Sequence, residues 1–63
     1  MNAAEARDRL PDVPVESRSG IIHQGRVRGR LNRFATVYVE GIALEYSWEA
    51  VARAATTNIP LTF

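Results

Sequence analysis

The segment Gly25–Leu31 reads Gly-Arg-Val-Arg-Gly-Arg-Leu, so arginine alternates strictly with small or apolar residues. A period of two is the period of a β-strand, in which successive side chains point to opposite faces. We therefore expect Arg26, Arg28 and Arg30 to share one face, while Val27 points the other way into the interior. This segment alone predicts that the chain builds a sheet.

The same alternation extends back to Ile21, which predicts a single strand over Ile21–Leu31 with its odd positions facing inward. Gly25 and Gly29 fall on that inward face. Glycine inside a strand usually marks a bend, a bulge or a close approach of backbone, and a strongly coiled strand of a small barrel needs that room. A hairpin that turns at Gln24-Gly25 is the alternative interpretation, and we favour the bent strand.

Three later segments also have strand character. Phe34–Glu40 is rich in β-branched and aromatic residues and is apolar on both faces, which favours a central strand covered on each side. After a turn at Glu40-Gly41, the segment Ile42–Tyr46 is expected to point its even positions inward. Ile59–Phe63 reads as a short edge strand, a position that tolerates proline.

One short helical pattern separates the last two of these strands. Ser47 is a good N-cap, and Glu49 places a negative charge in the first turn, where it suits the helix dipole. Apolar residues then recur at helical spacing until Pro60, which cannot continue a helix. We expect one short helix over residues 48–55 that buries an apolar stripe formed by Trp48, Val51, Ala52 and Ala55.

The expected order over residues 20–63 is strand, strand, strand, short helix, strand. This is the order of elements in an SH3-like small barrel, so we expect a β-rich domain of that architecture. The alternative is an antiparallel meander with one short helix packed across it.

Residues 1–18 have a different character. Ala3–Leu10 contains good helix formers and is stopped by Pro11. An extended stretch follows, in which valines are available for packing. We expect an extended or partly ordered N-terminal arm over residues 1–18 and a single small β-rich domain over residues 19–63.

The chain has 63 residues, no cysteine and one histidine. A domain this small buries only about 60% of the surface that its unfolded chain exposes, and neither a disulfide framework nor a zinc site is available to compensate. Good packing or self-association must therefore supply the stability. No apolar run approaches the ~20 residues of a membrane span, and no signal peptide pattern opens the chain. We expect a cytoplasmic protein with no membrane partner, and its small size and initial methionine favour a prokaryotic, phage or plasmid accessory protein.

Positive charge is concentrated in the middle of the chain, although the net charge is only +1. Between Arg18 and Val39 there are five arginines and no acidic residue. Guanidinium groups about 6.6 Å apart along a strand suit the phosphates of a nucleic-acid backbone, and an aromatic ring near such a row can stack on a base. The candidate nucleic-acid-binding residues are Arg26, Arg28, Arg30, Arg33 and Tyr38.

Two other interpretations of the arginine row involve no nucleic acid. Charge protects an exposed sheet edge from aggregation, and Glu40 and Glu45 on neighbouring strands are candidate ion-pair partners. The chain is then a protein–protein interaction or dimerisation module that acts on a larger partner. Edge pairing through the apolar C-terminal segment is the expected homodimer contact, and its interface residues are Ile59, Leu61 and Phe63.

No enzymatic activity is expected. His23 is the only imidazole, and its nearest ionisable neighbours in the sequence are arginines, so a general acid–base pair is lacking. Ser47 is explained as a helix cap, and no Walker-type loop is present. The glutamates of the C-terminal half have no metal-ligand spacing with His23. We therefore expect no catalytic residue, no metal, no cofactor and no small-molecule substrate.

Overall fold

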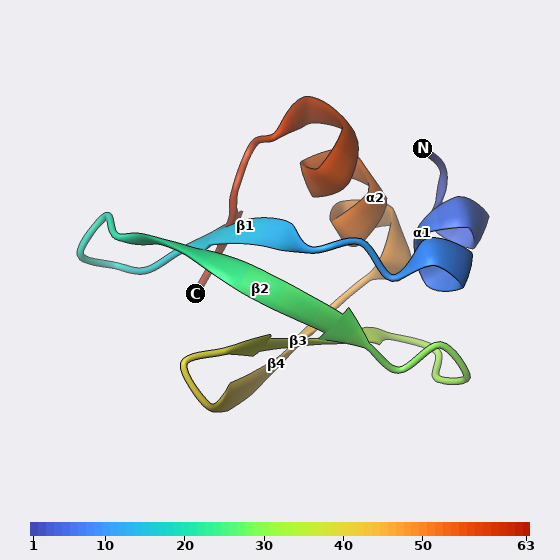
Figure 1. Ribbon diagram of the computed structural model, residues 1–63, viewed down its shortest axis with the longest axis horizontal. Helices are drawn as coiled ribbons and strands as arrows, with labels where there is room; N and C mark the ends of the chain where they lie inside the picture. Colours follow the sequence, from blue (N-terminus) through green and yellow to red (C-terminus); the bar gives the residue numbers. More distant parts are fainter.

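The computed structural model describes all of residues 1–63. The chain folds into a five-stranded sheet that curls into a half-barrel and is accompanied by two helices (Figure 1). The prediction of a β-rich domain of small-barrel or meander type with a short helix is confirmed. In chain order the elements are α1 (Ala3–Arg9), β1 (Val13–Glu16), β2 (Ile22–Arg28), β3 (Ala35–Val39), β4 (Ile42–Tyr46), α2 (Trp48–Thr57) and β5 (Leu61–Thr62).

The strands lie in the order β4-β3-β2-β1-β5. β2 is antiparallel to both β1 and β3, and β3 is antiparallel to β4. β5 pairs in parallel with β1 because α2 carries the chain from the β4 edge to the opposite edge. The two edges are linked where the hydroxyl of Tyr46 in β4 donates a 2.7 Å hydrogen bond to the carbonyl of Thr62 in β5.

β2 is one continuous strand that changes partner along its length. Its first part, through Gly25, pairs with β1, and its last part, Arg26–Arg28, pairs with β3. Gly25 is buried at the change of partner, where an added Cβ would lie 2.6 Å from Val37 Cγ1 and 2.7 Å from Val15 Cγ2. The bent strand is therefore confirmed, and the alternative hairpin does not form.

β2 ends earlier than the sequence predicts. Gly29 has a φ of +93°, a left-handed conformation that glycine adopts readily. The Gly29 carbonyl accepts a 2.9 Å hydrogen bond from the Asn32 amide, so the chain turns away from the sheet. The expected inward position of Leu31 is wrong, because its side chain lies beyond this turn and is 97% exposed. Ile21, expected to face inward at the other end, precedes the strand and is also exposed.

The core lies between the inner side of the sheet and the helices. Along β2 and β3 the burial alternates as the period of two predicts. Trp48 is almost fully buried at the start of α2, and its indole N–H donates a 3.1 Å hydrogen bond to the carbonyl of Asn32. The largest fully buried side chains are all valines: Val13, Val15, Val27, Val37, Val39 and Val51.

α2 begins where the sequence predicts. The side chain of Ser47 accepts a 3.0 Å hydrogen bond from the Ala50 amide, which caps the helix. α2 ends at Thr57, and Asn58 closes it in the left-handed conformation. Neither α1 nor α2 has the length and hydropathy that a membrane crossing requires.

The expected arm over residues 1–18 is integrated into the same core. α1 begins with a capping box at Asn2 and packs on α2, which buries Ala6 completely. Val13 and Val15 are fully buried in β1, between β2 and β5. The boundary expected at residue 18 therefore does not coincide with a boundary in the packing.

β3 is covered on one face only, so the expected burial on both faces is wrong. Val37 and Val39 face the core, whereas Phe34 and Tyr38 are 49% and 46% exposed. In Figure 1, α2 lies above the sheet, and α1 lies at the right, level with β1. A chain of 63 residues has no further element left to form a second covering layer.

Candidate functional site

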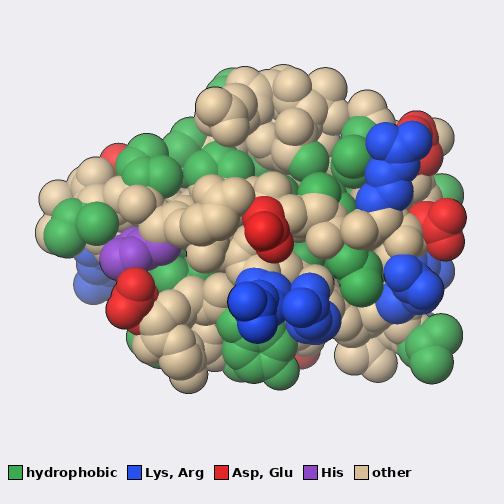
Figure 2. Space-filling view, viewed as in Figure 1, with side chains coloured by type: hydrophobic (Ala, Val, Ile, Leu, Met, Phe, Trp, Pro, Cys, Tyr) green, Lys and Arg blue, Asp and Glu red, His purple; other side chains and the backbone are tan.

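The sheet surface that points away from the core contains three of the five candidate nucleic-acid-binding residues, Arg26, Arg28 and Tyr38. We call this surface the outer face. Figure 2 shows neighbouring arginine side chains beside hydrophobic ones near the centre of the view. The outer face consists of outward-pointing residues of β2, β3 and β4 together with the residue just before β3: Ile22, Gln24, Arg26, Arg28, Phe34, Thr36, Tyr38, Ala43 and Glu45.

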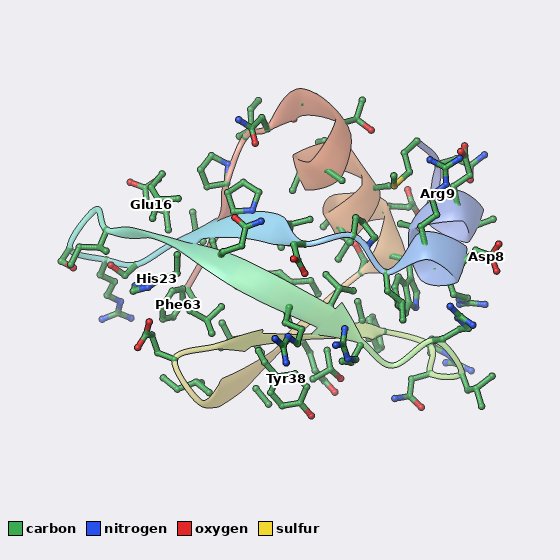
Figure 3. The ribbon with its side chains drawn as sticks, viewed as in Figure 1. Asp8, Arg9, Glu16, His23, Tyr38 and Phe63 are labelled. Carbon is green, nitrogen blue, oxygen red and sulfur yellow. The ribbon has the colours of Figure 1, made fainter.

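Strand register places the arginines of β2 beside the side chains of β3. Arg26 lies directly opposite Tyr38, and Arg28 lies opposite Thr36. Cross-strand partners have Cβ atoms about 5 Å apart, so the Arg26 and Tyr38 side chains are immediate neighbours. On the other side of Tyr38 its partner in β4 is Ala43, whose small side chain leaves that flank of the ring open. Figure 3 shows Tyr38 on the side of the sheet remote from the helices.

No carboxylate pairs with the two arginines of the outer face. The two salt bridges of the protein lie elsewhere, one within α1 and one of 3.4 Å between His23 and Glu40. Arg26 makes no side-chain hydrogen bond, and Arg28 donates only to the carbonyl of Val27, at 2.7 Å. The ion-pair interpretation of the arginine row therefore finds no contact in its support.

Asp12 comes just before the Val13–Gly25 pair of β1 and β2, and Glu16 lies opposite Ile22, so both carboxylates border β2 from the β1 side. Glu45 is the acidic residue on the β4 side of the outer face. It lies opposite Thr36, which in turn lies opposite Arg28. Two strand spacings, about 9.6 Å, separate the backbones of Glu45 and Arg28. At that separation an exposed carboxylate is largely screened by physiological salt.

Arg30 does not continue the row. It follows Gly29 in the turn after β2, and its guanidinium group donates hydrogen bonds to the carbonyls of Arg7 (3.3 Å) and Asp8 (2.7 Å). These carbonyls lie at the C-terminal end of α1, where the helix dipole favours a positive charge. Arg30 therefore fastens α1 to the turn, and two arginines of the expected three remain on the strand face.

Arg33 lies in the bend between β2 and β3. It is exposed and forms no salt bridge. Its neighbour in the sequence, Phe34, belongs to the outer face. Arg33 thus adds an exposed positive charge at the end of that face and is not a further member of the Arg26–Arg28 row.

The candidate interface residues at the C-terminus differ in exposure. Ile59 is 63% exposed, whereas Leu61 and Phe63 pack partly buried against the core of their own chain. The Phe63 ring also lies against His23, with ring centroids 6.1 Å apart (Figure 3). Among these residues only Ile59 offers a largely free apolar side chain.

The possible metal ligands of the chain are dispersed, and His23 is paired with a single carboxylate, that of Glu40, at 3.4 Å. No group of three or more His, Cys, Asp or Glu residues lies together. The one hollow of the surface lies between the start of α1 and α2, and its only charged side chains are Glu49 and Arg53. None of the candidate residues lines it.

Phe34 belongs to the outer face, although it was not among the predicted nucleic-acid-binding residues. Phe34 and Tyr38 are four residues apart, an even spacing that places both on one face of an extended strand. That spacing was a usable signal, but the expectation that β3 is covered on both faces assigned the ring to the interior.

Comparisons with known proteins identify no relative of this chain. No protein-family model, no curated protein and no solved structure matches this chain. The function must therefore be inferred from the site itself.

Proposed function

We propose that this protein is a small non-enzymatic nucleic-acid-binding module whose outer face contacts phosphates through Arg26 and Arg28. One observation carries the proposal: two neighbouring guanidinium groups without carboxylate partners project from an uncovered sheet face. The forked donors of arginine match the oxygens of a phosphate. Tyr38, beside Arg26, adds an exposed aromatic surface. We place this activity in the cytoplasm, as an accessory to a larger assembly.

Two phosphate contacts support only weak, salt-sensitive binding. Each neutralised phosphate contributes about 0.7 to 0.9 to the slope of log affinity against log salt. Arg26 and Arg28 together therefore predict a slope of roughly −1.4 to −1.8, and a contact by Arg33 makes it steeper. Dissociation constants in the non-specific range, about 10⁻⁴ to 10⁻⁶ M, are expected at physiological salt.

The test is an alanine substitution of both outer-face arginines, measured by fluorescence anisotropy with a labelled 12-nucleotide oligonucleotide at 50 mM salt. We expect Arg26→Ala with Arg28→Ala to weaken binding by roughly tenfold and to flatten the salt dependence, because both phosphate contacts are lost. The fold should persist, since both side chains are exposed.

A matched control removes the same charge from the opposite side of the sheet. Arg9→Ala with Arg53→Ala changes two exposed arginines of the helices. Wild-type-like binding by this control variant, with loss in the outer-face variant, supports a local site. Equal losses in the two variants would instead mean that net charge alone attracts the oligonucleotide.

The second candidate function is dimerisation through the C-terminal edge of the sheet. β5 has a neighbour on one side only, and the exposed Ile59 precedes it. Pairing of two β5 edges would bring Ile59, Leu61 and Phe63 of two copies together. The short length of β5 and the inward packing of Leu61 and Phe63 limit the area available, so this function ranks second.

Sedimentation equilibrium tests the dimer. Wild-type protein at high micromolar concentration is expected to show a dimeric mass that Ile59→Asp reduces to the monomeric mass, because a charge at the edge opposes pairing. A monomeric wild-type protein at that concentration excludes the dimer.

A further inference from the structure

We propose that the outer face takes a single nucleic-acid strand, whose phosphates lie along β2 and whose bases lie over β3 and β4. A base stacks on the ring of Tyr38 in this arrangement. Single-strand recognition depends on the nucleic-acid binding proposed above and specifies the form of the ligand.

The width of the sheet disfavours entry into a duplex groove. The major groove of B-DNA is about 12 Å wide and admits a helix or a two-stranded ribbon. Four neighbouring strands, β1 to β4, span about 14 Å between their outer backbones. Neither helix contributes a residue to the outer face, so neither is placed to enter a groove there. A broad sheet surface instead suits a strand whose bases are unpaired and accessible.

The β3–β4 hairpin is the two-stranded ribbon at the β4 edge of the sheet, and its charge opposes duplex binding. Glu40 lies at its turn, and Glu45 lies on β4. Neither strand of the hairpin carries a basic residue. Glu40 is paired with His23 at 3.4 Å, so Glu45 is the carboxylate of the hairpin that the closely spaced phosphates bordering a groove would repel.

The arginines and the aromatic rings form two parallel rows. Arg26 and Arg28 are on β2, about 6.6 Å apart along the strand. Tyr38 lies on the neighbouring strand β3, and Phe34 comes just before that strand, about 13 Å from Tyr38 if the chain is extended. Thr36 lies between the two rings and opposite Arg28. A strand laid along the sheet thus meets cations on one side and ring surfaces on the other.

Tyr38 has the surroundings that base stacking requires. Its ring is 46% exposed, and its hydroxyl makes no hydrogen bond within the protein. Arg26 flanks it on β2, and Ala43 flanks it on β4. The small Ala43 leaves room for a base beside the ring. An arginine next to a stacked base also contributes a cation–π contact.

These contacts use groups that DNA and RNA share. Phosphates and base faces are common to both, and stacking tolerates every base. We therefore expect single-stranded DNA and RNA to bind with similar affinity and with little dependence on sequence.

The experiment compares labelled dT12, rU12 and a 12-base-pair duplex by fluorescence anisotropy at 50 mM salt, using the full chain. We expect both single strands to bind at least fivefold more tightly than the duplex. Tyr38→Ala should weaken single-strand binding by about fivefold or more, because a base–aromatic stack is lost. Tyr38→Phe keeps the ring and should bind within twofold of wild type. Circular dichroism of each variant confirms that it is folded.

NMR spectra of the ¹⁵N-labelled protein with dT12 locate the contact. Shifts confined to amides of β2, β3 and β4, with upfield shifts of the Tyr38 ring protons, support stacking on the outer face. If these amide shifts depend on the protein concentration and not on the concentration of dT12, the outer face binds a second copy of the chain. That result would overturn the inference.

The two proposals fail in different ways. A duplex that binds as tightly as dT12, or a folded Tyr38→Ala variant that binds dT12 like wild type, overturns single-strand stacking. Binding that still depends on Arg26 and Arg28 in that case leaves the nucleic-acid proposal intact. If the affinities for dT12 and rU12 differ by more than tenfold, the protein does not recognise phosphates and base faces alone. The absence of binding to all three oligonucleotides overturns both proposals.

Discussion

At the scale of the residue, Gly25 shows how closely the sheet is packed where β2 changes partner. A side chain at this position would meet methyl groups of Val37 and Val15 and, at 3.1 Å, the carbonyl oxygen of Val13. All three valines are fully buried. Because protein interiors are close-packed, they cannot easily move aside for an added methyl group. Two of these three contacts come from β1.

We expect Gly25→Ala to lower the free energy of unfolding by about 1–3 kcal/mol, because an added methyl group overpacks the core. Urea unfolding followed by Trp48 fluorescence measures the change. Gln24→Ala is the control on the exposed side of the same strand, and its effect should stay within about 0.5 kcal/mol. A Gly25→Ala protein with the wild-type urea midpoint contradicts this account of the bend.

At the scale of the element, α1 needs its surroundings in order to be a helix. A seven-residue helix is unstable by itself in water. The capping box at Asn2 satisfies its first turn, Ala6 packs against α2, and Arg30 binds the carbonyls at its last turn. Arg30, which does not lie on the outer face, therefore stabilises this helix.

Arg30→Ala should loosen α1 without unfolding the sheet. Hydrogen exchange of the α1 amides is expected to speed up several-fold, because two charge-assisted hydrogen bonds at the helix end are lost. Arg33→Ala changes the same charge nearby but removes no hydrogen bond, so exchange in α1 should stay at the wild-type rate. Unchanged α1 exchange in the Arg30→Ala protein would show that the contact contributes nothing.

At the scale of the whole molecule, the half-barrel depends on contacts between its two edges. β4 and β5 are joined through the chain by α2 and directly by the hydrogen bond from Tyr46 to Thr62. Burial raises the pKa of the Tyr46 hydroxyl above its ordinary value of 10.0. The neutral hydroxyl is the form that donates this bond, so the closure of the barrel is sensitive to alkaline pH.

Below pH 10 the hydroxyl is protonated in both the folded and the unfolded chain, and its contribution to stability is complete. Above pH 10 the unfolded chain releases the proton first, so this contribution is lost as the pH rises through the folded pKa. We expect Tyr46→Phe to lower the free energy of unfolding by about 1 kcal/mol at pH 7. The variant should also lack the part of the decline in stability above pH 10 that comes from Tyr46.

Urea midpoints between pH 7 and pH 11 test the role of Tyr46. Tyr38→Phe is the control, since the Tyr38 hydroxyl makes no hydrogen bond that the substitution removes. The proposed role of the edge contact is rejected if Tyr46→Phe and wild type show the same midpoint at pH 7 and the same alkaline decline.

Short-range patterns predicted much of the fold and part of the site. The alternation around Val27 predicted β2 and its faces, the inward Gly25 predicted the bend, and Ser47 predicted the start of α2. The same alternation placed Arg26 and Arg28 together on one face. Each of these features depends on neighbours a few residues away, which the sequence displays directly.

Contacts between distant segments decided the rest. β1 pairs in parallel with β5, β3 is covered on one face only, and Arg30 donates hydrogen bonds to α1. Each of these features joins residues that are far apart in the chain. The sequence by itself determined which side chains share a face, because the period of a strand is set by local backbone geometry. Only the tertiary structure decided which face stays uncovered and which arginines remain free, because burial and pairing are settled by the packing of the whole chain.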